Sequence, residues 1–218
     1  MPTTPLLTID LLHDVLTELG TLARAEGKVI EVAIYGGSAL MLASNFRIAT
    51  RDVDAVADDD GQRVIERLAA TIAARRGWPP AWLNDQVYPF LSEMVDGLDD
   101  HHSLYRSYPS EHEPGLRVFV PTAEYLLAMK LMAMRIHSAD DAKDRTDILN
   151  LLAIVGLGTS VEAMKFLEAF YPQARVSLKV IAGLDELFAR ADTTRDANSE
   201  DSPHVAPAYL GRGRTPRT

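Results

Sequence analysis

Two short segments of this chain combine residue types that could do chemistry together. Residues 35–39 read Tyr-Gly-Gly-Ser-Ala after an apolar run, and residues 51–54 read Arg-Asp-Val-Asp. In a strand, residues i and i+2 point to the same face, so Asp52 and Asp54 are expected to lie side by side. Two such carboxylates repel each other unless a cation or a proton lies between them. Their hard oxygens favour Mg²⁺, which completes its shell with water and substrate phosphates.

The glycine pair indicates where those phosphates would bind. Gly36 and Gly37 let the backbone approach a phosphate closely, and Ser38 is expected to open a helix whose N–H groups face an anion. Arg47 and Arg51 bracket the acidic pair and could offset the charge of a triphosphate. Taken singly, the two motifs also fit a tight turn and a solvated strand end. Their spacing favours a bound nucleoside triphosphate and its metal.

The order Gly-Gly-Ser, helix, Asp-x-Asp on a strand resembles the polymerase-β-like nucleotidyltransferases. A second block, residues 121–135 with 143–148, is similar to the AbiEii-like (MenT-like) nucleotidyltransferase toxins of bacterial toxin–antitoxin pairs. The resemblance covers roughly residues 28 to 155. It implies Mg²⁺-dependent transfer of a nucleoside monophosphate from an NTP to an acceptor, often the 3′ end of tRNA, with release of pyrophosphate. A cognate antitoxin protein would then be a partner.

Two other functions stay open at this point. One is a small-molecule nucleotidyltransferase, as in aminoglycoside-modifying relatives. The other is a non-catalytic nucleotide-binding regulator whose partner is the antitoxin. No residue pattern indicates hydrogen bonding to the edge of a particular base, so the sequence does not predict which NTP is used.

Lys130 is the main candidate in the second half of the chain. Its neighbours at i±3 and i±4 on an expected helix are apolar, and an unpaired ammonium is costly to bury. Its long stem could reach water, or it could meet an anion, either Asp144 or Asp147 or the triphosphate. The resemblance, in which this lysine is a hallmark, favours the triphosphate and a nucleotide-binding role for the two acids. Both acids also fit a helix N-terminus, where the dipole stabilises negative charge.

The resembled enzymes usually carry a third carboxylate, which acts as general base and metal ligand. Candidates here are Asp85, Glu93, Asp96 and Glu124. Without such a group, a one-metal site or a nucleotide-binding protein with little turnover would follow. Asn84 and Asp85 are also suspects because relatives share their Trp-Leu-Asn-Asp pattern. The alternative is that they tie the loop through side-chain-to-backbone hydrogen bonds.

Composition limits the classes of partner. The 218 residues are 47% hydrophobic and 24% charged, with no cysteine. No apolar run approaches the ~20 residues of a membrane span, so we expect a cytoplasmic protein. The net charge of −9 argues against generic affinity for nucleic acid, and any RNA contact needs a local basic stripe. The arginines available for one are Arg63, Arg67, Arg75 and Arg76, which also fit a solvated helix face, and Arg212, Arg214 and Arg217.

The expected fold is α/β (α+β), with a small mixed sheet followed by a C-terminal helical bundle and the active cleft between them. We expect a nucleotidyltransferase core over 1–120, the bundle over 121–191 and a mobile tail over 192–218. Expected helices are one from Thr8 to near Gly20 or Gly27, then 38–45, 62–76, 122–136, 140–155, 159–170 and 175–190. Expected strands are 29–35, 52–57 and 116–120, and residues 97–114 read as a polar connector with at most one short strand.

Overall fold

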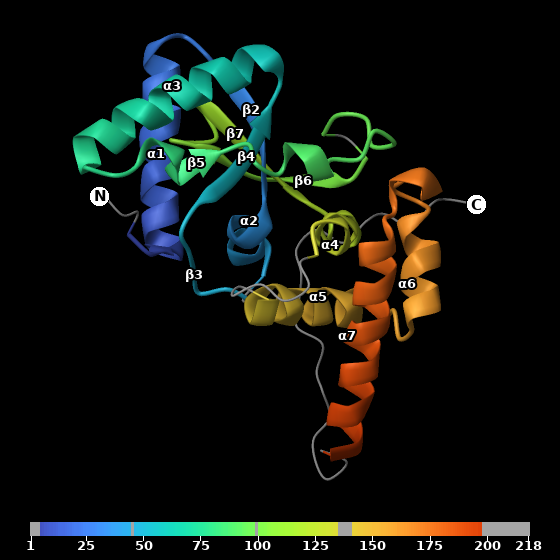
Figure 1. Cartoon of the computed structure of the whole chain (residues 1–218). Coiled ribbons are helices and arrows are strands. Elements are labelled where there is room, and N and C mark those ends of the chain that lie inside the picture. The colour runs from blue at the N-terminus through green and yellow to red at the C-terminus, as the bar shows by residue number, and fades with distance from the viewer. Residues whose placement is uncertain (1–4, 45, 99, 135–140, 198–218) are drawn as a thin grey trace. The chain divides into compact units, whose positions relative to one another are not determined.

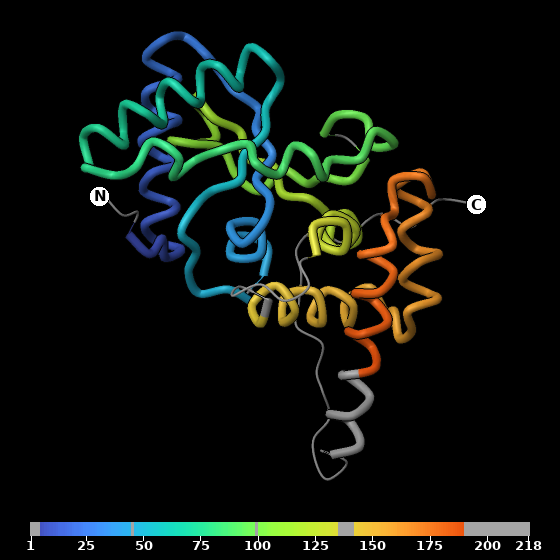
Figure 2. The backbone as a smooth tube through the Cα atoms, in the orientation of Figure 1, coloured from blue at the N-terminus to red at the C-terminus, as the bar shows by residue number. Residues whose placement is uncertain are grey.

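The structure, a computed structural model, describes residues 5–44, 46–98, 100–134 and 141–197 (Figure 1), and Figure 2 draws the backbone as a tube in the same orientation. The chain divides into two compact units, each described here by itself. The first comprises Met1–Pro89 and Gly97–Thr122, and the second comprises Phe90–Asp96 and Ala123–Thr218. The chain is therefore a mixed α/β protein with a sheet in its first unit and helices in its second.

A five-stranded mixed sheet forms the centre of the first unit (Figure 1). Its order is β5 (Leu83–Asn84), β4 (Val53–Ala57), β2 (Ile30–Tyr35), β7 (Leu116–Pro121) and β6 (His102–Tyr108). β2 runs antiparallel to β4 and parallel to β7. Buried Val32 and Ile34 share one face of β2, and Ala33 and Tyr35 share the other, so the strand is buried on both faces from Val32 to Tyr35. The expected mixed sheet is confirmed.

Three α-helices pack in the described part of this unit, and two of them have side-chain caps at their N-termini. Thr8 accepts from the N–H of Leu11 at the start of α1 (Ile9–Ala25), and Asp58 accepts from the N–H of Gly61 at the start of α3 (Asp59–Arg76). α1 and α3 pack against each other, and α2 (Gly36–Ala43) contacts both β2 and β4. β1 (Leu7–Thr8) pairs antiparallel with β3 (Ala49–Thr50) in a separate two-stranded ribbon, and β3 comes directly before β4 in the chain.

Two element boundaries near the glycine pair differ from the sequence prediction. α2 begins at Gly36 rather than Ser38, so both glycines belong to its first turn. β4 begins at Val53, so Asp52 precedes the strand. α1 ends at Ala25, near Gly27 rather than at Gly20. Gly20 lies buried inside the helix, where a Cβ would collide with the carbonyl of Tyr108.

The expectation of a polar connector over 97–114 with at most one short strand is only partly right. Residues His102–Tyr108 form β6, a seven-residue strand paired antiparallel with β7. The sequence of β6 lacks a regular alternation of polar and apolar residues. β6 is an edge strand, and a bulge between Leu104 and Arg106 shifts its register with β7. Leu104 is accordingly exposed, whereas Tyr108 is buried.

The second unit is helical, as expected. Its helices are α4 (Ala123–Met132), α5 (Asp141–Val155), α6 (Ser160–Leu167) and α7 (Leu178–Ala197), and α6 packs against α7 (Figure 1). Residues 90–96 join it through Ser92, which donates its N–H to the Tyr125 hydroxyl over 3.0 Å. Residues 192–197 continue α7 beyond the expected helix of 175–190, and the rest of the expected tail, with Arg212, Arg214 and Arg217, lies outside the described residues.

Within the described ranges, no single helix is long and apolar enough to cross a membrane. Residues 142–155 and 160–167 would be long and apolar enough only when taken together, and these two helices are bent by 83° at the break between them.

Candidate active site

The two sequence motifs meet where β2 ends and α2 begins. β2 and β4 are antiparallel with Tyr35 opposite Asp54, so the end of one strand lies beside the start of the other. Gly36, the first residue of α2, has φ +61°, a left-handed conformation that favours glycine. A Cβ on Gly36 would collide with Oδ2 of Asp54. The carboxylate of Asp54 therefore occupies the space that glycine leaves open.

Asp52 is attached to the same helix by two contacts. The buried Ser38 hydroxyl donates to the carbonyl of Asp52 over 2.9 Å, and the Thr50 hydroxyl donates to Oδ1 of Asp52 over 3.4 Å. Thr50 itself lies against the helix, since a Cβ on Gly37 would be 3.1 Å from its Oγ1. These contacts, rather than the strand alternation expected from the sequence, place Asp52 at the first turn of α2.

The first turn of α2 has features of an anion site. In the described structure its N-cap residue, Tyr35, makes no side-chain capping hydrogen bond. Backbone N–H groups of a first helical turn attract negative charge. A Cβ on Gly37 would lie 3.7 Å from Nη1 of Arg47, so this guanidinium reaches the same turn. Arg51 is exposed and directly precedes Asp52.

Asn84 lies next to Asp54 on the other side. β4 and β5 are parallel with Asp54 opposite Asn84, so both side chains share one face of the sheet. Trp82 holds this register because it is fully buried and its Nε1 donates to the carbonyl of Ala69 in α3 over 3.0 Å. The Asn84 amide also ties the loop, since its Oδ1 accepts from the N–H of Gln86 over 3.0 Å. Asn84 therefore ties the loop, as one of the two alternatives expected, and its role in the site stays a prediction.

His102 belongs to the segment that the sequence predicted as a polar connector, but it lies near the same end of the sheet. Its Nε2 shares a 2.8 Å hydrogen bond with the hydroxyl of Tyr35, and the two rings meet edge to face at 83°. Burial lowers the pKa of His102 from 6.5 to about 4, so the ring is neutral at pH 7. No sequence pattern marked this pair, because Tyr35 and His102 are 67 positions apart.

In the second unit, Lys130 contacts both acids that the sequence offered as partners. Its Nζ lies 2.8 Å from Oδ2 of Asp147 and 3.5 Å from Oδ1 of Asp144. The side chains of Lys130 and Asp147 are 12% and 4% exposed, whereas Asp144 is 40% exposed. A buried ammonium requires such pairing. Its binding to a triphosphate stays a prediction.

The third carboxylate stays a prediction as well. Across the ranges that the structure describes, no three His, Asp or Glu side chains gather in a way that could hold a metal ion. Asp85 and Asp96 are exposed, and Glu93 pairs with Arg175 at 3.4 Å. Oε2 of Glu124 is buried with no hydrogen-bond partner in the described part of the chain.

The arginines of α3 are engaged by acids. Arg67 donates to both carboxylate oxygens of Glu26 at 2.8 and 2.6 Å, which lowers the pKa of Glu26. Arg75 and Arg76 both contact Glu18, at 3.4 and 2.8 Å. Arg63 pairs with Asp60 within the helix. Their geometry fits a solvated, salt-bridged helix face.

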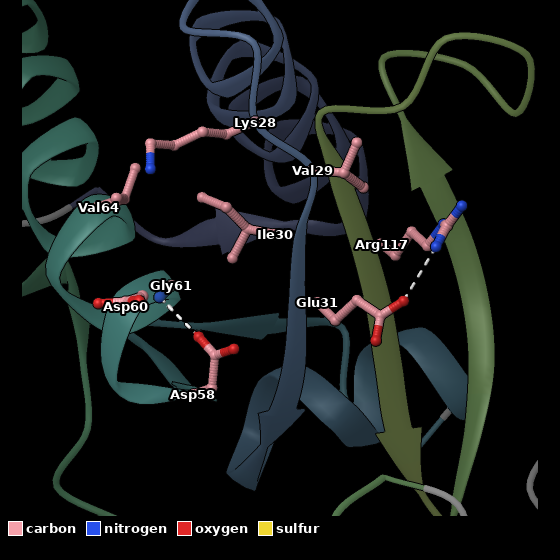
Figure 3. Close-up of a pocket in the computed structure, with 9 residues that line it drawn as sticks. All are labelled: Lys28, Val29, Ile30, Glu31, Asp58, Asp60, Gly61, Val64 and Arg117. Atoms are coloured by element: carbon pink, nitrogen blue, oxygen red, sulfur yellow. Dashed lines mark hydrogen bonds and ion pairs between the residues drawn. The ribbon is translucent and has the colours of Figure 1, made fainter.

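A cavity of about 340 Å³ in the first unit is not part of this arrangement (Figure 3). It lies at the start of β2, the opposite end of that strand from Tyr35, and beside the first turn of α3. Glu31 and Arg117 pair across its rim at 3.0 Å. Its lining consists of Lys28, Val29, Ile30, Glu31, Asp58, Asp60, Gly61, Val64 and Arg117.

The Asp54 carboxylate lies against the glycine-rich start of α2, and Asp52 is held beside the same helix through its carbonyl and through Thr50, so this end of the mixed sheet is the candidate phosphate site. A family model described as a nucleotidyltransferase of unknown function (DUF6036) matches residues 10–171, and the chain belongs to this family. The matched residues include Gly36, Asp52, Asp54 and Lys130.

One solved structure with a similar chain is that of an antigenic nucleotidyltransferase-like protein from Paracoccidioides brasiliensis. It is 16% identical, with a TM-score of 0.47 over 89% of this chain and 93% of that chain. No curated protein sequence matches the chain significantly.

Proposed function

We propose that this protein transfers a nucleoside monophosphate from an NTP to an acceptor hydroxyl, with Mg²⁺ as cofactor and pyrophosphate as the second product. One observation carries the proposal. Asp52 and Asp54, the acids singled out in the sequence, both lie against the first turn of α2 in a member of a nucleotidyltransferase family.

The residues present fit Mg²⁺. Asp52 and Asp54 would hold it through carboxylate oxygens, the hard ligands that this ion prefers. Two carboxylates provide part of an octahedral shell, which suits an ion that keeps waters and binds substrate phosphates. When bound, it would neutralise charge on the phosphates during transfer.

The chain's own groups would orient the triphosphate. The N–H groups of Gly37 and Ser38 in the first turn of α2, with the guanidinium of Arg47, would bind its phosphate oxygens, and Arg51 would add charge beside Asp52. The acceptor oxygen would form a bond to the α-phosphorus while the bond to the bridging oxygen breaks. Pyrophosphate would leave with that electron pair, and the hydroxyl proton would pass to a base or to water. Phosphoryl-type transfers depend mainly on such positioning and charge stabilisation.

Lys130, Asp144 and Asp147 form a separate part of the proposal. We propose that the ammonium of Lys130, oriented by the two carboxylates, also contacts the phosphates of the nucleotide. The support is its membership in the motif that resembles the AbiEii-like enzymes. Because the acids already satisfy the charge of Lys130, this role needs its own test.

For the acceptor we propose the 3′ end of a tRNA, in a cytoplasmic toxin that a cognate antitoxin inhibits. The support is the resemblance of residues 121–135 and 143–148 to the AbiEii-like toxins. The pairing of the α3 arginines and the net charge of −9 favour the alternative of a small-molecule acceptor. A non-catalytic nucleotide-binding regulator is the third outcome that an experiment must separate.

The test incubates the protein with each labelled NTP, Mg²⁺ and total tRNA, and scores label in RNA, in small molecules and in protein-bound nucleotide. Label in RNA from one NTP supports the full proposal. Label in a small acceptor retains the enzyme and removes tRNA. Retention of an NTP without any transfer supports the regulator, and the absence of both binding and transfer for all four NTPs contradicts the proposal.

A further inference from the structure

The pair Tyr35–His102 joins the edge of the sheet to the start of α2. Tyr35 is 4% exposed, is the N-cap residue of α2, and lies opposite Asp54 in the β2–β4 register. His102 is the first residue of β6 and lies opposite Pro121 of β7. The 2.8 Å hydrogen bond therefore ties together two strands that are not adjacent in the sheet.

The consequence for the site follows from the crowding around Gly36. Its Cα lies so close to Asp54 that an added Cβ would meet the carboxylate, so a small shift of the Tyr35–Gly36 backbone must move that carboxylate. The phenol–imidazole contact fixes the Tyr35 ring from β6, and the edge-to-face packing of the two rings adds to this restraint.

We propose that His102 is a positioning residue for the phosphate and metal site, acting through Tyr35 on Gly36 and Asp54. The inference rests on the proposed function, because it assigns His102 a role in that same site. His102 would touch neither nucleotide nor metal in this role. A neutral imidazole suits it, since its unprotonated nitrogen can accept the phenol O–H.

The chain contains a matched control for this contact. Tyr108, at the other end of β6, is 3% exposed, and its hydroxyl shares a 2.7 Å hydrogen bond with Nδ1 of His13. Tyr108→Phe and Tyr35→Phe thus each remove one hydroxyl from a buried tyrosine–histidine pair in the same unit. If the Tyr35–His102 pair had a purely structural role, Tyr35→Phe and Tyr108→Phe would have the same effects on stability and transfer.

The experiment compares Tyr35→Phe, His102→Leu, their double variant and Tyr108→Phe by thermal unfolding, by transfer kinetics over a Mg²⁺ series and by ¹⁵N NMR. We expect Tyr35→Phe and His102→Leu each to lower transfer or metal affinity by about ten- to a hundredfold, the usual range for groups that orient metal ligands. The double variant should be no worse than either single one. His102→Gln, which can still bond the phenol, should recover part of the loss, and Tyr108→Phe should lower Tm alone.

Amide shifts of Gly36, Gly37 and Asp54 give a readout that does not need activity. They should move in Tyr35→Phe and stay in place in Tyr108→Phe. If both phenylalanine variants behave alike in kinetics and in these shifts, the proposal is overturned. If the wild type neither binds nor transfers a nucleotide, the proposed function fails, and unmoved shifts at Gly36 and Asp54 would then overturn the positioning role as well.

Discussion

At the scale of single residues, close contacts constrain the side chains and backbone of the candidate site. Gly36 combines a left-handed backbone with contact to Asp54, and Ser38 and Thr50 hold Asp52. Gly36, Ser38, Asp52 and Asp54 could be singled out from the sequence by their spacing, whereas Thr50 could not, and their chemical roles stay predictions. It could not predict His102, because a hydrogen bond over 67 positions leaves no local pattern.

A comparison of Gly36→Ala with Gly77→Ala should distinguish the effect of backbone strain on stability from the effect of the contact with Asp54 on the site. Both glycines have positive φ, +61° and +66°, but a Cβ on Gly77 meets nothing within 4 Å. Each alanine should cost about 1–2 kcal/mol of stability in urea unfolding, because both force a left-handed residue. Only Gly36→Ala should also abolish Mg²⁺-dependent nucleotide binding in calorimetry. Equal binding by both variants would show that the contact with Asp54 has no role in the site.

The acid sensitivity of folding should depend on His102. Its pKa is about 4 in the folded protein and 6.5 when unperturbed. As pH falls below 6.5, the unfolded chain takes up a proton that the folded chain does not bind until about pH 4. Folding should therefore lose up to about 3 kcal/mol across this window, at about 1.4 kcal/mol per pKa unit. His102→Gln should lose less stability than the wild type between pH 7 and 4.5 in urea unfolding, and equal losses would place the acid sensitivity elsewhere.

At the scale of elements, the sequence predicted those with strong local signals. β2 is an apolar run interrupted only by Glu31, and α1 and α3 begin after the capping residues Thr8 and Asp58. β6 was missed because an edge strand with polar residues and a bulge lacks the period of two. The pairing of the α3 arginines with α1 also depends on packing between helices that local periodicity does not encode.

Lys130→Ala should destabilise the α4–α5 pair strongly. It would leave Asp147, 4% exposed, as a buried carboxylate without its ammonium, at a cost of about 3–5 kcal/mol. Asp144→Asn should cost below about 1 kcal/mol, since Asp144 is half-exposed and farther from Lys130. Urea unfolding of both variants measures the difference. A Lys130→Ala protein of near wild-type stability but without transfer would instead assign Lys130 to the nucleotide.

Replacing both Arg75 and Arg76 by alanine tests whether α3 binds the acceptor. Both arginines already pair with Glu18 at the surface, so their loss should cost below about 1 kcal/mol of stability. Transfer and its dependence on salt should stay as in the wild type. A marked loss of transfer to RNA, together with a shallower salt dependence, would show that α3 forms part of an RNA surface.

At the scale of the whole molecule, the sequence predicted a mixed sheet followed by helices, and the family match extends over both units. It did not predict that residues 90–96 join the helical unit. Ser92 and Phe90 make their hydrogen bonds with Tyr125 and Tyr171, far along the chain. Contacts of this kind depend on tertiary packing rather than on local propensity.

The central claim is that Asp52 and Asp54 support transfer of a nucleoside monophosphate. The most direct measurement supplies the preferred NTP labelled either at the α- or at the γ-phosphate, to the wild type and to Asp52→Asn and Asp54→Asn, with and without Mg²⁺. We expect the α-label to enter the acceptor, the γ-label to leave as pyrophosphate, and both signals to disappear without Mg²⁺ or in either folded variant. Transfer of the γ-label, or full activity in either asparagine variant, would contradict this expectation.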